Sequence, residues 1–160
     1  DVVLDSTYKE YVFTFNNIHP ATDGAELDFN VSIDAGSNYN VTKTTTAFDA
    51  YHDEGGSASN LGYRTSEDLA QSTSFQTLSQ NIGADNDQST SGTLTLFSPS
   101  STTFVKHFIS NFNIAESDEV VREQFIAGYA NTTSAVDAIQ FKMSTGDIDL
   151  GDICLYGISS

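Results

Sequence analysis

Two acidic clusters contain the residues whose types and spacing best suit binding chemistry. Asp85 and Asp87 lie in a polar stretch, and three further carboxylates lie within six residues near the end of the chain: Asp147, Asp149 and Asp152. Carboxylates and backbone carbonyls at this density are the ligands that Ca²⁺ prefers, although neither cluster matches an EF-hand loop. We expect no required cofactor. Calcium is the candidate metal, and it would stabilise the closing turn rather than serve catalysis.

Hydrolytic chemistry has weaker support in the sequence. A serine-hydrolase site needs a histidine between a nucleophile and an orienting carboxylate, and His19, His52 and His107 occur without a nucleophile elbow. We expect each histidine to lie in a turn or on a strand surface. A glycosidase pair could be drawn from three neighbouring carboxylates, Asp49, Asp53 and Glu54. Nothing singles out two of them, so we expect a solvated acidic loop and no enzymatic activity.

Several tyrosines lie at the edges of expected loops, where aromatic rings can stack on sugars. The candidates for sugar stacking are Tyr39, Tyr51 and Tyr63, with Tyr129 as a fourth. The alternative is that these rings simply close the hydrophobic core.

Composition excludes two classes of partner. The formal net charge is −16, with only 6 Lys and Arg residues against 22 Asp and Glu residues, so no cationic patch can bind nucleic-acid phosphates. No stretch approaches the roughly 20 apolar residues of a membrane helix. The chain begins at Asp1 rather than Met and is expected to be a processed or partial product. Its one cysteine, Cys154, is expected to be a buried, inert thiol in a core strand.

The stretch 138–158 predicts two apolar strands joined by a turn, and the sequence pattern suggests a closing hairpin. Ile139, Phe141 and Met143 alternate with polar residues, as in a half-buried strand. The run 153–158 is apolar on both faces, which favours a strand inside the sandwich. Such a strand must pair with strands much earlier in the chain.

The rest of the chain predicts further short strands. The range 8–18 alternates aromatic and polar residues, and 26–34 alternates so regularly that we expect one buried and one solvent-exposed side. The other expected strands are 44–52, 61–64, 74–82, 93–98, 103–114 and 121–130. Ser66 could cap one helical turn at 66–71.

This pattern predicts an all-β fold. About nine or ten short strands without a long helix favour an antiparallel β-sandwich of jelly-roll type, formed by residues 1–160 as a single domain. Because the first and last strands both look core-like, we expect the two ends of the chain to meet in one sheet.

Three stretches together resemble a known family. Tyr11-x-Phe13-x-Phe15-x-Asn17-Ile18-x-Pro20 is followed by Ser32-x-Asp34-x-Gly36, and the chain closes on Leu155-Tyr156-Gly157-Ile158. This pattern is similar to virion structural proteins of tailed bacteriophages, especially phages of marine bacteria and cyanobacteria. The segments 104–107 and 128–133 also resemble that family, so the likeness covers nearly the whole chain. It implies a jelly-roll module of phage tails, fibres or capsid surfaces, without a catalytic motif.

The resemblance leads to a functional expectation. We expect a non-enzymatic virion structural protein, either a head-decoration protein or a tail-fibre or appendage subunit, located in the extracellular particle. Its partners would be other virion proteins and further copies of itself, with a trimer as the natural guess. Because of the −16 charge, self-contacts should be apolar or bridged by cations. The alternative is a carbohydrate-binding module, for a host-surface glycan or in a secreted protein, and the least favoured is a polysaccharide depolymerase.

Overall fold

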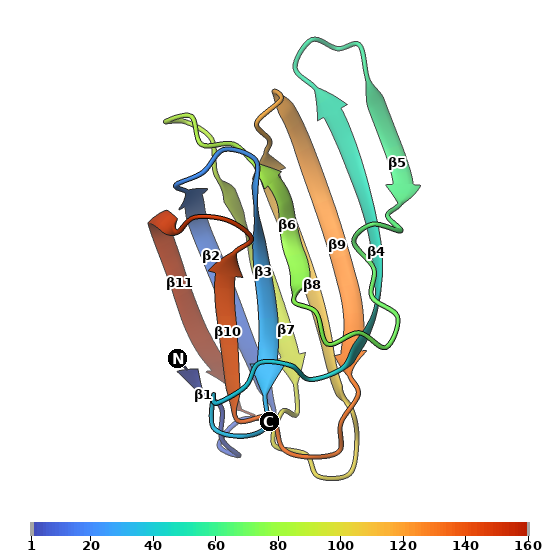
Figure 1. Cartoon of the computed structure of the whole chain (residues 1–160), viewed down its shortest axis with the longest axis vertical. Coiled ribbons are helices and arrows are strands. Elements are labelled where there is room, and N and C mark those ends of the chain that lie inside the picture. Colours follow the sequence, from blue (N-terminus) through green and yellow to red (C-terminus); the bar gives the residue numbers. More distant parts are fainter. Residues whose placement is uncertain (1, 160) are drawn as a thin grey trace.

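The computed structural model describes residues 2–159 and confirms an antiparallel β-sandwich (Figure 1). The strands are β1 (Val2–Val3), β2 (Glu10–Pro20), β3 (Ala25–Ser32), β4 (Lys43–Asp53), β5 (Ser59–Tyr63), β6 (Gln76–Ile82), β7 (Thr90–Phe97), β8 (Lys106–Ala115), β9 (Val120–Ala130), β10 (Ala138–Met143) and β11 (Ile148–Ile158). The smaller sheet has the order β1-β10-β3-β6, and the larger has the order β11-β2-β7-β8-β9-β4-β5. The described residues contain no helix, and hence none that could cross a membrane. The expected helical turn at 66–71 is irregular chain after a turn at 65–67. The jelly-roll order of connections remains a prediction.

Aromatic side chains fill the space between the two sheets. Phe141 of β10 packs edge-on against Phe13 and Phe15 of β2, with ring centroids 5.2 and 5.0 Å apart. Phe29 of β3 meets Phe108 of β8 in the same way at 5.0 Å. These pairs join the sheets, and one hydrophobic cluster extends along the chain from Leu4 to Ile148. The alternation predicted for 8–18 is therefore confirmed.

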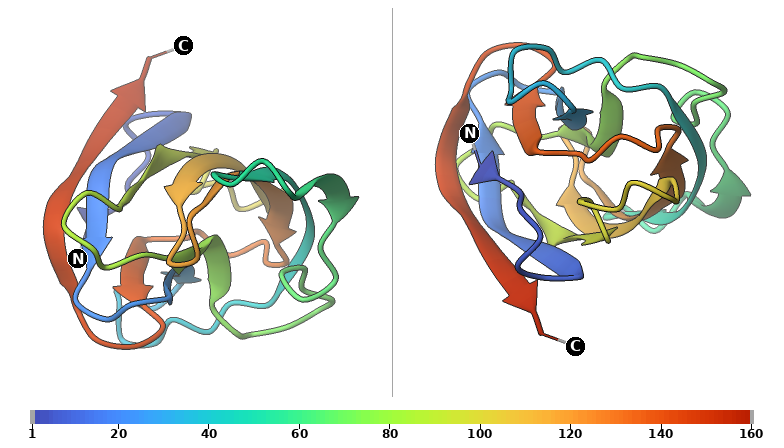
Figure 2. Two further views of the ribbon diagram at one scale, coloured as in Figure 1. Left: turned by 90° about the horizontal axis from the view of Figure 1, so that it is seen from above. Right: turned by 90° about the horizontal axis from the view of Figure 1, so that it is seen from below.

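The predicted meeting of early and late strands is also confirmed. β11 pairs antiparallel with β2, with Ile153 opposite Phe15 and Leu155 opposite Phe13. Figure 2 shows these two strands side by side at one end of the larger sheet.

The expected closing hairpin is wrong. β10 and β11 both form, but β10 pairs with β1 and β3 in the smaller sheet, whereas β11 pairs with β2 in the larger. The turn between them therefore crosses from one sheet to the other. It uses Gly146 at φ +69°, where a Cβ would lie 2.4 Å from Oγ1 of Thr22. Turn residues mark where a strand ends but do not determine which sheet receives the next strand.

The exposed side expected for 26–34 is also wrong. Asp28, Asn30 and Ser32 are buried, like the apolar residues between them, while Ile33 lies beyond β3 and is exposed. Asn30 donates hydrogen bonds from Nδ2 to the carbonyl oxygens of Tyr39 and Thr73. The loops that contain Tyr39 and Thr73 therefore lie against the C-terminal part of β3.

β11 differs from the expected core strand because it lies at the edge of its sheet. Ile153, Leu155 and Tyr156 have relative exposures of 38, 37 and 53%. Cys154 is half-buried rather than buried, and it lies opposite Thr14 on the outer face. An apolar run on both faces is typical of a central strand, but here one side of the strand has no neighbour.

Candidate functional site

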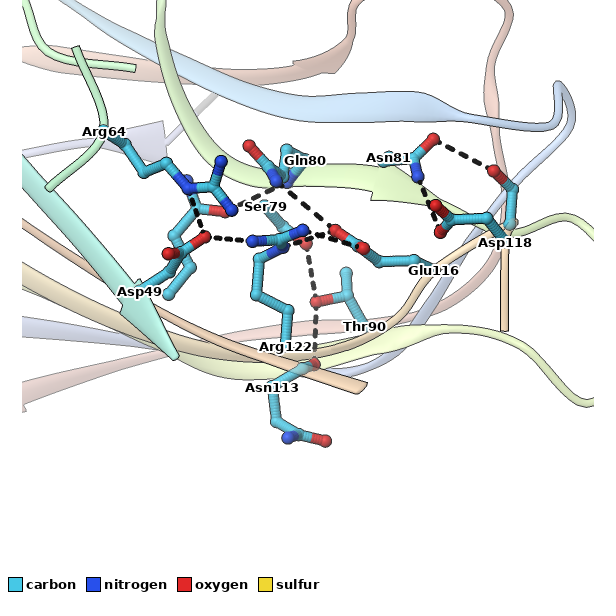
Figure 3. A network of polar contacts seen from close by, with 12 residues as sticks. Asp49, Arg64, Ser79, Gln80, Asn81, Thr90, Asn113, Glu116, Asp118 and Arg122 are labelled. Carbon is cyan, nitrogen blue, oxygen red and sulfur yellow. Dashed lines mark hydrogen bonds and ion pairs between the residues drawn. The ribbon is translucent and has the colours of Figure 1, made fainter. Parts of the chain in front are cut away.

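A buried ionic network lies inside the sandwich, among side chains of the larger sheet and of the segments that adjoin it (Figure 3). Arg122 of β9 binds Glu116 through Nε at 2.5 Å and Nη2 at 3.0 Å, and it also binds Oδ2 of Asp49 through Nη1. Arg64 donates from Nε to the same Asp49 oxygen at 2.6 Å. The pKa of Arg122 is raised because its bonds to the two carboxylates outweigh the effect of burial. This arrangement keeps Arg122 charged.

The network removes Asp49 from the candidate carboxylates of a glycosidase. Its side chain is fully buried beneath two arginines, so a substrate cannot reach it. Asp53 has a local role, because it accepts hydrogen bonds from Ser57 and from the backbone of Ala58, which lower its pKa. Glu54 lines a small acidic hollow with Glu119. The structure therefore does not bring these three carboxylates together as a reactive pair.

The two acidic clusters converge on one polar cavity of about 470 Å³. Asp87 from the 83–89 loop and Asp152 from β11 both line it, together with His19 at the end of β2. Nδ1 of His19 lies 3.6 Å from Oδ2 of Asp149, and Nε2 lies 3.3 Å from the backbone oxygen of Asp85. Sequence reasoning identified each cluster but did not predict that they meet.

Metal binding at this cavity remains a prediction. Within residues 2–159, no three His, Cys, Asp or Glu side chains are grouped closely enough to hold an ion. Asp147 does not line the cavity, and its carbonyl accepts a hydrogen bond from the amide of Ala21. Any cation here would therefore depend on backbone oxygens and water as well as carboxylates.

The three tyrosines proposed for sugar stacking do not share a surface. Tyr39 lies half-buried in the loop after β3, against Gly36. Tyr51 faces inward, with the guanidinium carbons of Arg122 and Arg64 at 4.9 and 5.9 Å from its ring centroid. Tyr63 is exposed and donates to Asp68 at 2.6 Å.

The fourth tyrosine, Tyr129, lines an apolar groove on the outer face of the larger sheet. The groove has a volume of about 500 Å³ and runs across β8, β9 and β4. In the middle strand, the small side chain of Ala127 lies between Ile109 and Thr46. In the next row Tyr129 lies between His107 and Thr44. The hollow exists because Ala127 leaves space where larger residues surround it.

The groove carries no ionised side chain of the Asp, Glu, Lys or Arg type. Its lining consists of Thr44, Thr45, Thr46, His107, Phe108, Ile109, Ala127, Gly128 and Tyr129. A second hollow of about 470 Å³ shares His107, includes the exposed Phe104, and is also free of these four residue types. In a chain of net charge −16, this surface suits an uncharged partner. Aromatic faces beside hydroxyl groups can bind sugars, and the apolar floor can bind protein.

Sequence reasoning had named His107 and Tyr129 but missed Ile109 and Ala127. The sequence contained a signal for Ile109, because β8 has apolar residues on both of its faces. Phe108 and Phe112 face inward, whereas Ile109 is 55% exposed. An outward apolar residue in an otherwise alternating strand indicates a contact surface or a covered face.

Comparison with known protein families, with curated proteins and with solved structures gives no match to this chain.

Proposed function

We propose that this chain is a non-enzymatic structural subunit of a tailed-bacteriophage particle, a head-decoration protein or a tail-fibre or appendage subunit. The resemblance of the segments 11–20, 32–36 and 155–158 to virion proteins supports the phage assignment. Its location would be the extracellular virion, and its partners would be neighbouring virion proteins and further copies of itself.

The observation that carries the assembly role is the distribution of charge. The chain has 22 acidic residues, yet the outer groove and the run 153–158 of β11 carry none. Both surfaces expose large apolar side chains, which monomeric proteins usually keep scattered. Acidic subunits can pack closely only through uncharged contacts of this kind, because unscreened like charges repel one another.

The test is mass spectrometry of purified phage particles from the source that encodes the chain. We expect peptides of this protein at a stoichiometry that matches a symmetric assembly, and a cryo-EM map of the particle would distinguish head from tail. Absence of the chain from intact particles would refute the proposal.

A second candidate, the binding of a neutral glycan by the outer groove, is favoured by the side chains of Tyr129, His107 and Thr44. They combine an aromatic face with hydroxyl and imidazole groups on an uncharged surface. His107 and Tyr129 meet edge-on, with ring centroids 6.2 Å apart. A host-surface glycan would be the biological ligand of such a receptor-binding face.

A glycan array tests this second candidate. Retention of neutral glycans should be lost in Tyr129→Ala and His107→Ala but kept in Tyr63→Ala, which removes an exposed tyrosine of β5 outside the groove. Failure of the native chain to retain any sugar at millimolar concentration would refute glycan binding and would leave the structural role untouched.

A further inference from the structure

The outer edge of β11 is free along its C-terminal half. The strand follows β2 in continuous register from Asp152 to Ile158. Within residues 2–159, the structure gives no backbone hydrogen bond from 152–158 to any segment other than β2. Figure 2 shows β11 at the rim of the sandwich with no segment outside it. Alternate N–H and C=O groups of this half of β11 therefore point outward from the sheet.

The other three sheet edges carry features that oppose pairing with another chain. β5 has only five residues and contains Gly62. β1 has two residues. β6 has register shifts against β3 on both sides of Leu27, which bend its edge. Short edges and irregular register are among the usual protections against edge-to-edge association, and the half of β11 from 152 to 158, although it contains Gly157, has neither bulge nor proline.

The side chains of β11 are apolar on both faces of the sheet. Ile153 and Leu155 lie on the inner face, opposite Phe15 and Phe13, but remain more than a third exposed. Tyr156 and Ile158 lie on the outer face with exposures of 53 and 44%. The strand thus offers free backbone groups together with apolar side chains that a neighbouring strand would bury.

The charges along β11 indicate which strand would fit. Its carboxylates, Asp149 and Asp152, are confined to the N-terminal half, whereas 153–159 is uncharged. Two copies in antiparallel pairing place the acidic half of one strand away from the acidic half of the other. Parallel pairing would align them, and like charges side by side are destabilising.

We propose that β11 pairs antiparallel with β11 of a second copy of this chain, about a twofold axis, to form one continuous sheet across the dimer. The choice of a second copy rests on the assembly role proposed above. The proposed β11–β11 pairing specifies a twofold contact in place of the trimer expected from the sequence. An isologous contact needs a self-complementary surface, and an uncharged strand with both faces apolar meets that requirement.

Pleating limits the register to two choices near the centre of the run. Residues opposite one another in an antiparallel pair point to the same face of the sheet. The twofold axis therefore lies where one residue of β11 faces the same residue of the second copy, and not midway between two successive residues of the strand. With the axis at Leu155, Ile153 lies opposite Gly157 of the second copy. With the axis at Tyr156, Cys154 lies opposite Ile158.

Site-specific crosslinking tests both the contact and its register. In a Cys154→Ser background, which removes the single native cysteine, Leu155→Cys should give a disulfide-linked dimer if the axis passes through 155. Tyr156→Cys should do so if it passes through 156. Directly opposed Cα atoms lie about 4.5–5.5 Å apart, within the range that a disulfide spans, whereas diagonal neighbours are too distant. Leu61→Cys on the opposite edge is the control and should stay monomeric under the same oxidation. Failure of both β11 variants to crosslink, or equal crosslinking of the control, would overturn the proposal.

Sedimentation equilibrium of the purified chain measures the association itself. We expect a monomer–dimer equilibrium that tightens as salt screens the −16 charge. Leu155→Glu and Tyr156→Glu should each weaken it by at least about tenfold, because the two new carboxylates face each other near the axis. Leu61→Glu adds the same charge at the β5 edge and should leave the equilibrium unchanged.

A native chain that stays monomeric at every ionic strength would overturn the proposal, and so would a dimer insensitive to both β11 variants. Neither result would affect detection of the chain in particles, so the two proposals fail separately.

Discussion

Nζ of Lys43 donates a hydrogen bond of 2.6 Å to Oδ1 of Asn30 in the interior, where both side chains are fully buried. Its other acceptor is the carbonyl oxygen of Val41 at 3.1 Å, so both of these partners are neutral. Burial lowers the pKa of Lys43 from 10.5 to about 7. The ammonium group is therefore costly to bury, and its cost depends on pH.

We predict that the free energy of unfolding rises with pH between 7 and 9.5. The pKa of Lys43 in the folded chain lies below its unfolded value, so the unfolded chain binds more protons in this window. The cost of burial is complete below pH 7 and is relieved as the pH rises through it, by at most about 1.4 kcal/mol per pH unit for one proton.

Urea unfolding of Lys43→Met checks this dependence. The variant should lose much of the slope, although not all of it, because burial also lowers the pKa of Lys106. The exposed Lys142 supplies the control, and Lys142→Met should keep the native slope. An unchanged slope in Lys43→Met would show that Lys43 does not titrate in this range.

Asp28 should be a position where a conservative substitution stabilises the protein. Burial raises the pKa of this carboxyl from 3.8 to about 6, although the hydrogen bond from Thr77 opposes the shift. Since the folded pKa lies above the unfolded value, stability falls as pH rises from about 4 to about 6, and the cost is complete above 6. Asp28→Asn should therefore raise stability at pH 7 by about 1–3 kcal/mol.

The gain should disappear near pH 4, where the native carboxyl is protonated in the fold. Thermal unfolding at pH 4 and pH 7 measures both values. Asp87→Asn removes the same charge at an exposed position and serves as the control for net charge. An equal gain at the two pH values would contradict the proposed desolvation cost.

The strands were predictable from the sequence because each has a local pattern, but their partners were not. The alternation of Tyr11, Phe13 and Phe15 predicted a buried face, and all three are buried. By contrast, the assignment of β10 and β11 to different sheets depends on contacts with β3 and β2, more than a hundred residues away. A short turn containing Gly146 serves a hairpin or a crossing between sheets equally well.

The candidate sites show the same limit. Asp87 and Asp152 were each identified from local acidity, yet only the fold shows that they line one cavity. Asp49 looked like part of a solvated acidic loop, but it faces Arg122 inside the sandwich. The expected strand 44–52 included Asp49, but pairing with β9 supplied a counter-charge that no local pattern shows.

The predicted effect of calcium can now be tested at a defined place. If a cation bridges the 83–89 loop and β11, millimolar calcium should raise the unfolding midpoint relative to chelator, since a ligand that binds only the folded state stabilises it. Asp87→Asn and Asp152→Asn should each reduce the shift, because both line the cavity. Asp118→Asn, outside that cavity, should retain it. Equal midpoints with calcium and with chelator would mean that these carboxylates are surface charge only.

The ionic network predicts that removing Arg122 alone destabilises the protein more than removing Arg122 together with the two carboxylates that it binds. Arg122→Met leaves Asp49 and Glu116 buried without their shared cation, and loss of one partner of a buried ion pair costs about 3–5 kcal/mol. Arg64 still binds Asp49, but within residues 2–159 Glu116 pairs with no second arginine.

The triple variant Asp49→Asn, Glu116→Gln, Arg122→Met removes both carboxylates and the arginine between them, so the charge that remains in the network is that of Arg64, whose side chain is 29% exposed. We therefore expect it to be more stable than Arg122→Met alone, although it contains two additional substitutions. Glu123→Gln, outside the network, is the control for a single lost carboxylate and should change stability little. Denaturant unfolding of the native chain and these three variants measures the differences. A triple variant less stable than Arg122→Met would show that the network contributes more through its hydrogen bonds than it costs in desolvation.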